Sequence, residues 1–327
     1  MVDLRFGLES LSGVRFGVSP LLETTLSVGV LSYPEDAAFH LHWVERARER
    51  VGDLDLTPVR TLLSRDVPRY APDFLNPPPS GPCAELEEEL AVMAATPARQ
   101  VREEVQRCYE GRAVPAELEQ FITRPRSAIG ALAETLREYW QRALAPHWPR
   151  ICTLLDHDIL YRSQALVDGG MRALFEELDP QVKWDGKVLR IEKECTHPTV
   201  ELDERGLLLA PSVFAWPRVL IVSEPPWQPT MIYPARGVGM LWEPERPAPP
   251  DALAKLLGSS RASILAALDR PRSTTELARV LDISAGGVSQ HLAVLRSAGL
   301  VSSRRAQRLV LYLRSEHGDE LVQAVAG

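Results

Sequence analysis

The chain has 327 residues, of which 45% are hydrophobic and 25% are charged, and its formal net charge is −7. This composition is typical of a globular protein with a substantial core. The length exceeds the roughly 250–300 residues at which single cores stop growing, so we expect more than one domain. No apolar run reaches the ~20 residues of a membrane-spanning helix, and the first residues lack a secretion signal. We therefore expect a cytoplasmic protein without a membrane partner.

The charge is distributed unevenly along the chain. Residues 254–327 hold ten Lys and Arg against six Asp and Glu, a net +4, which leaves −11 for the rest. Because attraction to phosphate is screened beyond about 10 Å, the local charge matters more than the total. The C-terminal segment is therefore the part of the chain that is suited to nucleic acid.

Helices are predicted over much of the N-terminal part. Ser19 followed by Pro20 is typical of a helix start, which predicts a helix over 20–31, and a second follows over about 35–50. Residues 83–169 are predicted to be mostly helical. Within them, apolar residues recur at three- and four-residue spacing over 127–144, which indicates a face turned toward a core.

Strands are predicted after position 179. Residues 182–191 have an Asp-Gly turn between two strand-like arms. A second hairpin is predicted over 200–209, and further strands over 218–222 and 230–233. Together these segments predict a small, mostly antiparallel sheet.

Two proline-rich segments, 76–82 and 243–250, interrupt regular structure. The second marks the expected domain boundary. We predict an α+β fold: a helical region with a small antiparallel sheet, followed by a C-terminal winged helix-turn-helix domain. The expected parts are a regulatory or dimerisation domain over 1–242, a proline-rich linker over 243–252 and a DNA-binding domain over 253–327.

The C-terminal segment contains the strongest signal for function. Ser273 and Glu276 form a capping-box pattern at the start of a helix, and Ser284 is positioned to cap the next one. Val288, Leu292 and Leu295 give that second helix, 284–297, an apolar face. A helix of this kind, following a short turn, reads the major groove in helix-turn-helix proteins.

A wing is predicted over 300–313. Gly299 ends the helix, strand-forming residues follow, and three arginines lie at the tip before a strand over 309–313. Guanidinium groups there would contact phosphate or enter the minor groove, whereas Ser289 and Gln290 would reach base edges or phosphates. The candidate DNA-binding residues are Thr274, Ser284, Ala285, Gly286, Ser289, Gln290, His291, Arg296, Arg304, Arg305 and Arg308.

Residues 288–301, Val-Ser-Gln-His-Leu-Ala-Val-Leu-Arg-Ser-Ala-Gly-Leu-Val, resemble the winged-helix regulators of the ArsR type. The resemblance covers about the last 70 residues. More weakly, 16–20, 211–217 and 226–230 resemble the N-terminal domain of actinobacterial regulators described as ArsR-like. The resemblance implies a DNA-binding repressor or activator, usually dimeric, whose affinity responds to a signal, and we expect a repressor. Metal-sensing members carry cysteines on the helix before the recognition helix, but 274–282 contain no Cys or His.

Other chemistry has little support in the sequence. The four cysteines, at 83, 108, 152 and 195, are widely spaced and form no CxxC pair. Phosphate-binding, dinucleotide-binding, zinc-protease and nucleophile-elbow motifs are absent, so we expect no enzyme, no cofactor and no metal. The groups Cys152 to Asp158 and Cys195 with His197 are too sparse for a metal site.

Aromatic residues concentrate in the strand-rich region, at Trp184, Phe214, Trp216, Trp227, Tyr233 and Trp242. We expect them to fill the core there, with a pocket for an organic effector or a dimer surface as the alternative. The hypothesis for the whole chain is a homodimeric transcription regulator that binds double-stranded DNA and responds to a small-molecule effector of unknown identity. The alternatives are a winged-helix protein–protein module without DNA binding and, with least support, an enzyme.

Overall fold

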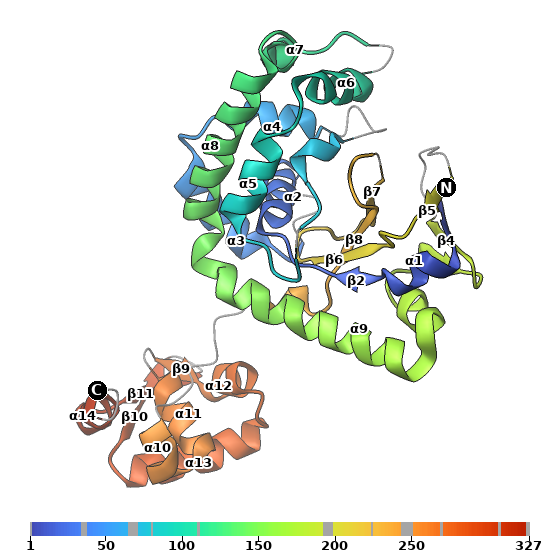
Figure 1. The fold of residues 1–327 in the computed structure, drawn as a ribbon. Helices are drawn as coiled ribbons and strands as arrows, with labels where there is room; N and C mark the ends of the chain where they lie inside the picture. Colours follow the sequence, from blue (N-terminus) through green and yellow to red (C-terminus); the bar gives the residue numbers. More distant parts are fainter. Residues whose placement is uncertain are drawn as a thin grey trace. The chain divides into compact units, whose positions relative to one another are not determined.

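The computed structural model describes residues 2–33, 38–64, 71–79, 81–109, 112–191, 199–223, 225–242, 251–268, 271–306 and 309–324. The chain divides into two compact units, Met1–Trp242 (unit 1) and Glu243–Gly327 (unit 2) (Figure 1). Each unit has a hydrophobic core of its own.

Unit 1 places most of its helices on one side and its strands on the other, with α9 running beneath both (Figure 1). Its helices are α1 (Leu8–Ser12), α2 (Pro20–Ser32), α3 (Leu41–Val51), α4 (Thr57–Leu62), α5 (Leu86–Ala94), α6 (Ala98–Cys108), α7 (Glu119–Thr123), α8 (Pro125–Ala143) and α9 (Trp148–Glu176). Its strands are β1 (Val2–Phe6), β2 (Arg15–Phe16), β3 (Val182–Trp184), β4 (Val188–Ile191), β5 (Val200–Leu202), β6 (Leu208–Ser212), β7 (Leu220–Val222) and β8 (Thr230–Pro234).

The predicted helices are found, but one starts later than predicted: the helix expected over about 35–50 is α3, which begins at Leu41 after a turn over 38–40. Helix α2 begins at Pro20, and the Ser19 hydroxyl accepts a hydrogen bond from the Leu22 amide at 2.9 Å. The apolar stripe of α8 is buried, as its spacing predicts. Helix α9 continues to Glu176, beyond the predicted end, and it kinks at Gly170, whose φ of +66° only glycine adopts at low cost.

The strands form two four-stranded sheets, with orders β3-β4-β1-β5 and β2-β6-β8-β7. The predicted hairpin over 182–191 is confirmed: β3 pairs antiparallel with β4, and Asp185 Oδ1 accepts from the amides of Lys187 (3.0 Å) and Val188 (2.8 Å). The predicted strands near 218–222 and 230–233 are β7 and β8, which also pair antiparallel.

The predicted hairpin over 200–209 is wrong. Its turn exists, since the Gly206 amide donates to the Asp203 carbonyl at 3.0 Å, but β5 pairs in parallel with β1 and β6 pairs in parallel with β2 and β8. The turn therefore carries the chain from one sheet to the other. A Cβ on Gly206 would lie 2.3 Å from the Gly13 carbonyl carbon, so the two backbones meet there. Both sheets are mixed, whereas a mostly antiparallel sheet was expected.

The aromatic residues of the strand-rich region do not form one cluster. Trp184 packs against Phe6, at 5.1 Å between ring centroids, and against Phe175. Trp242 instead packs against Trp43, at 5.8 Å, and Phe214. The two groups fill separate parts of the interior.

Unit 2 contains α10 (Asp251–Leu257), α11 (Ser259–Ala267), β9 (Arg272–Ser273), α12 (Thr274–Leu281), α13 (Ala285–Ser297), β10 (Val301–Ala306), β11 (Leu309–Arg314) and α14 (Glu316–Ala324). This arrangement confirms the predicted α+β class with a C-terminal helix-turn-helix region. The sheet has three strands in the order β10-β11-β9, one more than the predicted hairpin. Helix α10 begins at Asp251, inside the segment expected to be linker, whose residues 243–250 lie outside the described part.

A buried carboxyl group connects α2 to the end of β6. Glu23 is 1% exposed; its Oε1 accepts from the Val213 amide (2.9 Å) and its Oε2 from the Ser212 hydroxyl (3.1 Å). Burial raises the pKa of Glu23 to about 8, because the surrounding protein disfavours the charged form more than these hydrogen bonds favour it. The carboxyl is therefore mostly protonated at neutral pH.

We expect the free energy of unfolding of unit 1 to fall as the pH rises from about 6.5 to 8.5. A group whose pKa is higher in the folded than in the unfolded state stabilises the fold below both values and loses that contribution as pH rises through the folded value. Glu89, whose pKa burial raises to about 7, acts in the same direction. The buried His40 acts in the opposite direction, because burial lowers its pKa from 6.5 to about 4, but this effect fades as the pH rises above 6.5.

Urea titrations at the two pH values measure this difference, and Glu23→Gln should reduce it because the amide does not ionise. If Glu23→Gln keeps the full pH dependence of the wild-type chain, the burial of this carboxyl is not the cause.

Candidate nucleic-acid interface

Two capped helix starts define the helix-turn-helix of unit 2. At α12 the Glu276 amide donates to Ser273 Oγ (3.2 Å) and the Ser273 amide donates to Glu276 Oε2 (2.7 Å), which confirms the predicted capping box. At α13 the Gly287 amide donates to Ser284 Oγ at 3.1 Å. Between the helices, Asp282 adopts the left-handed conformation (φ 55°) that ends α12 and turns the chain into α13.

Helix α13 is divided into a buried face and an exposed face. Val288, Leu292 and Leu295 are at most 1% exposed and join the core of unit 2. Helix α13 contains no Asp or Glu, so no carboxylate of this helix would repel a phosphate. The exposed residues of the cap and the helix include Ser284, Ala285, Gly286, Ser289, Gln290, Ala293 and Arg296.

His291 and Thr274, the other two predicted residues of the helix-turn-helix, are less exposed than the residues on the open face of α13. His291 is half-buried beside the core face of α13. Thr274 is the first residue of α12 and is also half-buried, next to the capping box. Both are less accessible than Ser289 and Gln290.

Val294 was not predicted, although it lies one turn after Gln290 and is 46% exposed. It sits on the helix face opposite the buried residues, since side chains four apart share a face. The helical periodicity that predicts an exposed Gln290 also predicts an exposed Val294. Polar interfaces are usually made by polar side chains, so this valine was not among the predicted residues.

The N-terminal turn of α13 is open to approach. A Cβ built on Gly286 would meet no heavy atom within 4 Å, whereas one on Gly287 would lie 3.2 Å from both Ile283 Cγ2 and Ser284 Oγ. The N-terminal end of a helix also presents backbone N–H groups and a partial positive charge, which favour anions.

The β10–β11 hairpin, called the wing below, is antiparallel in the predicted position. Arg304 pairs with Leu311 in the ladder, and its side chain is exposed. The backbone of Arg305 pairs with Val310, but its side chain lies outside the described residues, as does the whole of Arg308.

A cluster at the base of the wing was not predicted. Arg314 Nε lies 2.7 Å from Asp319 Oδ1, the Ser315 hydroxyl donates to the Gly299 carbonyl, and a Cβ on Gly318 would lie 2.2 Å from the Leu300 carbonyl oxygen. These contacts fix the wing and α14 to the end of α13. Arg314 contributes to the net positive charge of residues 254–327, but its guanidinium group is already paired with the Asp319 carboxylate.

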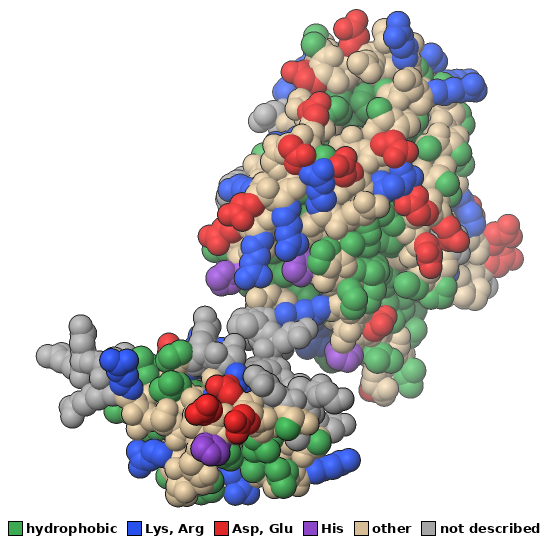
Figure 2. Space-filling model, turned by 90° about the vertical axis from the view of Figure 1, so that its left-hand side faces the viewer, with side chains coloured by type: hydrophobic (Ala, Val, Ile, Leu, Met, Phe, Trp, Pro, Cys, Tyr) green, Lys and Arg blue, Asp and Glu red, His purple; other side chains and the backbone are tan. Residues whose placement is uncertain are grey.

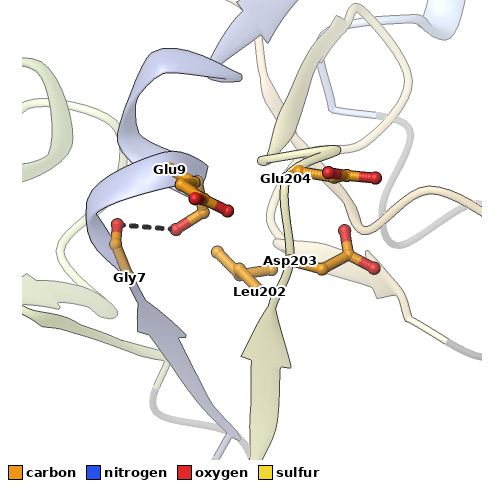
Figure 3. Close-up of a pocket in the computed structure, with 6 residues that line it drawn as sticks. Gly7, Glu9, Leu202, Asp203 and Glu204 are labelled. Carbon is orange, nitrogen blue, oxygen red and sulfur yellow. Dashed lines mark hydrogen bonds between the residues drawn. The ribbon is translucent and has the colours of Figure 1, made fainter.

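A pocket in unit 1 lies between α1 and the turn after β5 (Figure 3). Glu9 contributes a carboxylate from one side, and Asp203 and Glu204 contribute two from the other. Asp203 is paired with Arg205 at 2.8 Å. This carboxylate-rich lining is unsuited to phosphate, and none of the aromatic residues proposed to line an effector pocket takes part in it.

Comparison with known families supports the assignment of unit 2. A family model described as a helix-turn-helix domain matches residues 256–304. Residues 256–304 form a helix-turn-helix domain. The match begins near the end of α10 and runs through α11, α12, α13 and into β10. Because helix-turn-helix domains bind DNA through their second helix, this match supports a role as a DNA-binding regulator.

Residues 95–239 of unit 1 match a family of unknown function, DUF5937. No curated protein matches the chain. A solved structure of a mutant of Lactococcus lactis ZitR in apo form is similar at 25% identity, with a TM-score of 0.21. That match covers 23% of this chain and 61% of the other.

Within the described part of the chain, no three His, Cys, Asp or Glu side chains are grouped as a metal site. The pair Cys195 and His197 lies outside that part. No described helix is both long enough and apolar enough to cross a membrane.

We expect Gly286→Ala to raise the free energy of unfolding of unit 2 by about 0.5–1 kcal/mol. Alanine is the better helix former, and its Cβ would project into open space. Gly287→Ala, at the crowded neighbouring position, is the matched control and should gain less. Thermal or urea denaturation followed by circular dichroism measures both, and a destabilised Gly286→Ala variant would contradict the open geometry.

Proposed function

We propose that this chain is a homodimeric, sequence-specific DNA-binding transcriptional regulator of the ArsR-like type that acts as a repressor. The observation that carries the proposal is the exposed face of α13, which combines hydrogen-bonding groups, small residues and no carboxylate on a helix fixed by its buried face.

The proposed reading helix inserts this face into the major groove. The Gln290 amide can pair with an adenine edge and the Ser289 hydroxyl with a base or phosphate, because these groups donate and accept. Val294 can contact a thymine methyl group. Gly286 allows the backbone to come close, so Gly286→Ala should weaken DNA binding although it strengthens the free helix.

Phosphate contacts would come from the cationic groups around α13. Arg296 is exposed in the last turn of the helix and Arg304 on the wing, and we assign Arg305 and Arg308 to the same role. Ser284 and Ala285, at the N-terminal end of α13, would place backbone N–H groups near a phosphate. His291 and Thr274 are assigned to the edge of the contact because they are half-buried.

Two copies are needed for this mode of reading. Recognition helices of helix-turn-helix dimers bind half-sites about one DNA turn apart, which requires a two-fold arrangement. We assign dimerisation and the response to a small-molecule effector to unit 1. The helix before the recognition helix, α12, has no Cys or His, so we assign no metal to it.

Genome-wide recovery of DNA fragments bound to the full chain tests the proposal, followed by gel shifts with the recovered sequence. A shared sequence with two-fold symmetry is expected. Enrichment of no fragment, together with capture of a protein partner by the α13 face, would favour a winged-helix protein–protein module.

Gln290→Ala should lower the affinity for the recovered sequence by about 1–3 kcal/mol for each half-site, the usual contribution of a base-edge contact. Binding to unrelated DNA should change little, because phosphate contacts remain. Gln106→Ala, at an exposed position of α6 in unit 1, is the control. Fluorescence anisotropy with both duplexes measures the difference, and equal losses on both would show that Gln290 does not read sequence.

Replacing Arg304, Arg305 and Arg308 by Ala should weaken binding to all DNA sequences alike. Each lost phosphate contact reduces the slope of log affinity against log salt concentration by about 0.9, so the triple variant should lose about two to three units of slope for each bound copy, or about five for the dimer. Titrations from 50 to 300 mM salt give the slopes. If the triple variant keeps the wild-type salt slope, the three wing arginines do not contact phosphates.

A further inference from the structure

Unit 1 is acidic overall, yet one part of its surface gathers positive charge. On α3, His42, Arg46 and Arg50 are all exposed and are spaced four residues apart. Side chains at this spacing share one helix face, so the three form a stripe along α3.

The stripe continues onto neighbouring elements. Helix α3 packs on the C-terminal end of α8, where the Trp43 indole N–H donates to the Ala143 carbonyl at 3.0 Å and an Arg50 N–H donates to the Arg142 carbonyl at 3.4 Å. Directly after α8 come His147 and the first turn of α9, which carries Arg150. Burial lowers the pKa of His147, and the charges of Arg50, Arg46 and Arg150 lower it further, which agrees with their closeness.

We call His42, Arg46, Arg50, His147 and Arg150 the α3 patch. On the face of unit 1 in Figure 2, blue Lys and Arg and purple His side chains lie together, with red carboxylates beside them.

The nearby carboxylates leave two guanidinium groups available. Arg142 is paired with Asp53 at 2.6 Å and with Glu138. Among the described residues, neither Arg46 nor Arg50 forms an ion pair. Glu45 and Glu49 are exposed on the adjacent face of α3, so the patch is suited to a weak phosphate contact and not to tight binding.

The α3 patch lies beside Trp242, the last described residue of unit 1, through His147. The ring of Trp242 lies 5.8 Å from that of Trp43 and 5.4 Å from that of His147, and its indole N–H donates to His40 Nδ1 at 2.7 Å. These contacts fix the start of the linker beside the patch.

Chain length limits how far unit 2 can move from this point. Eight residues, 243–250, separate Trp242 from α10. Nine Cα–Cα steps join Trp242 to Asp251, and a fully extended chain spans at most about 3.3–3.6 Å per step, or roughly 30–32 Å in all. This reach is shorter than one turn of DNA, about 34–36 Å, so the start of α10 stays within one DNA turn of Trp242.

We propose that the α3 patch binds phosphates of the duplex that flanks the half-site read by α13. This inference rests on the proposed function. Guanidinium groups form charge-assisted hydrogen bonds with phosphate, and such contacts add affinity without reading sequence. Unit 1 would then help to orient the bound regulator as well as joining its two copies.

The test uses the full chain and a 40-base-pair duplex with the recovered sequence at its centre. Arg46→Gln with Arg50→Gln should reduce the salt slope by about two for each bound copy, or about four for the dimer, so the affinity ratio of wild type to variant should be roughly a hundredfold larger at 50 mM than at 200 mM salt. Arg46→Lys with Arg50→Lys keeps the charge and should retain most of the slope. Melting temperatures confirm that the variants are folded.

Arg99→Gln with Arg126→Gln is the matched control, because it removes the same charge from exposed positions of α6 and the first turn of α8. Arg126 lies 16 residues before Arg142 on α8, which is about 24 Å along a helix. A slope that is unchanged in the patch variant, or lowered equally by the control, overturns the proposal while DNA binding by unit 2 stands. If the wild-type chain does not bind the duplex at all, the proposed function itself fails.

Discussion

The packing of three side chains determines how α13 faces the solvent, and the rest of the proposed interface depends on it. Val288, Leu292 and Leu295 are buried at spacings of four and three residues. In a helix with 3.6 residues per turn, burying this stripe turns Gly286, Gln290, Ala293 and Val294 outward. A shift of one residue would expose an apolar side chain and bury a polar one, so the packing of the core also determines which face α13 presents to the solvent.

Several local interactions support that orientation. The Ser273–Glu276 box and the Ser284 cap fix where α12 and α13 begin, and the left-handed Asp282 sets the turn between them. At the other end, the Arg314–Asp319 ion pair and the close approach of Gly318 to Leu300 hold the wing to the last turn of α13. These contacts connect α13 directly to the wing. Unit 1 differs from unit 2 in that it contains two mixed sheets and buried carboxyl groups such as those of Glu23 and Glu89.

The features that follow from neighbouring residues could be predicted from the sequence. The caps at Ser19, Ser273 and Ser284, the buried stripe of α8 and the Asp185-Gly186 turn all depend on spacings of a few residues. The features that were missed depend on partners far away in the chain. Strand β1 pairs with β4 and β5, and β9 pairs with β11. A pattern of neighbouring residues does not determine which strands pair with each other.

The same distinction applies to the candidate site. Exposure of Ser289 and Gln290 follows from helical periodicity, and it is found in the structure. The ion pair of Arg314 could not be separated from the other arginines by sequence, because charge alone does not show whether a guanidinium faces a carboxylate or the solvent. Likewise, the basic stripe of α3 could not be recognised from the sequence, because the same helix also carries Glu45 and Glu49.

The most direct test of the central claim is a photo-crosslinking group placed at position 290, with position 106 on α6 as the control, in the full chain bound to its recovered DNA sequence. The account predicts crosslinks from position 290 to bases in each half-site and none from position 106. Stable DNA binding without crosslinks from position 290, or with crosslinks only to DNA outside the half-sites, would contradict it.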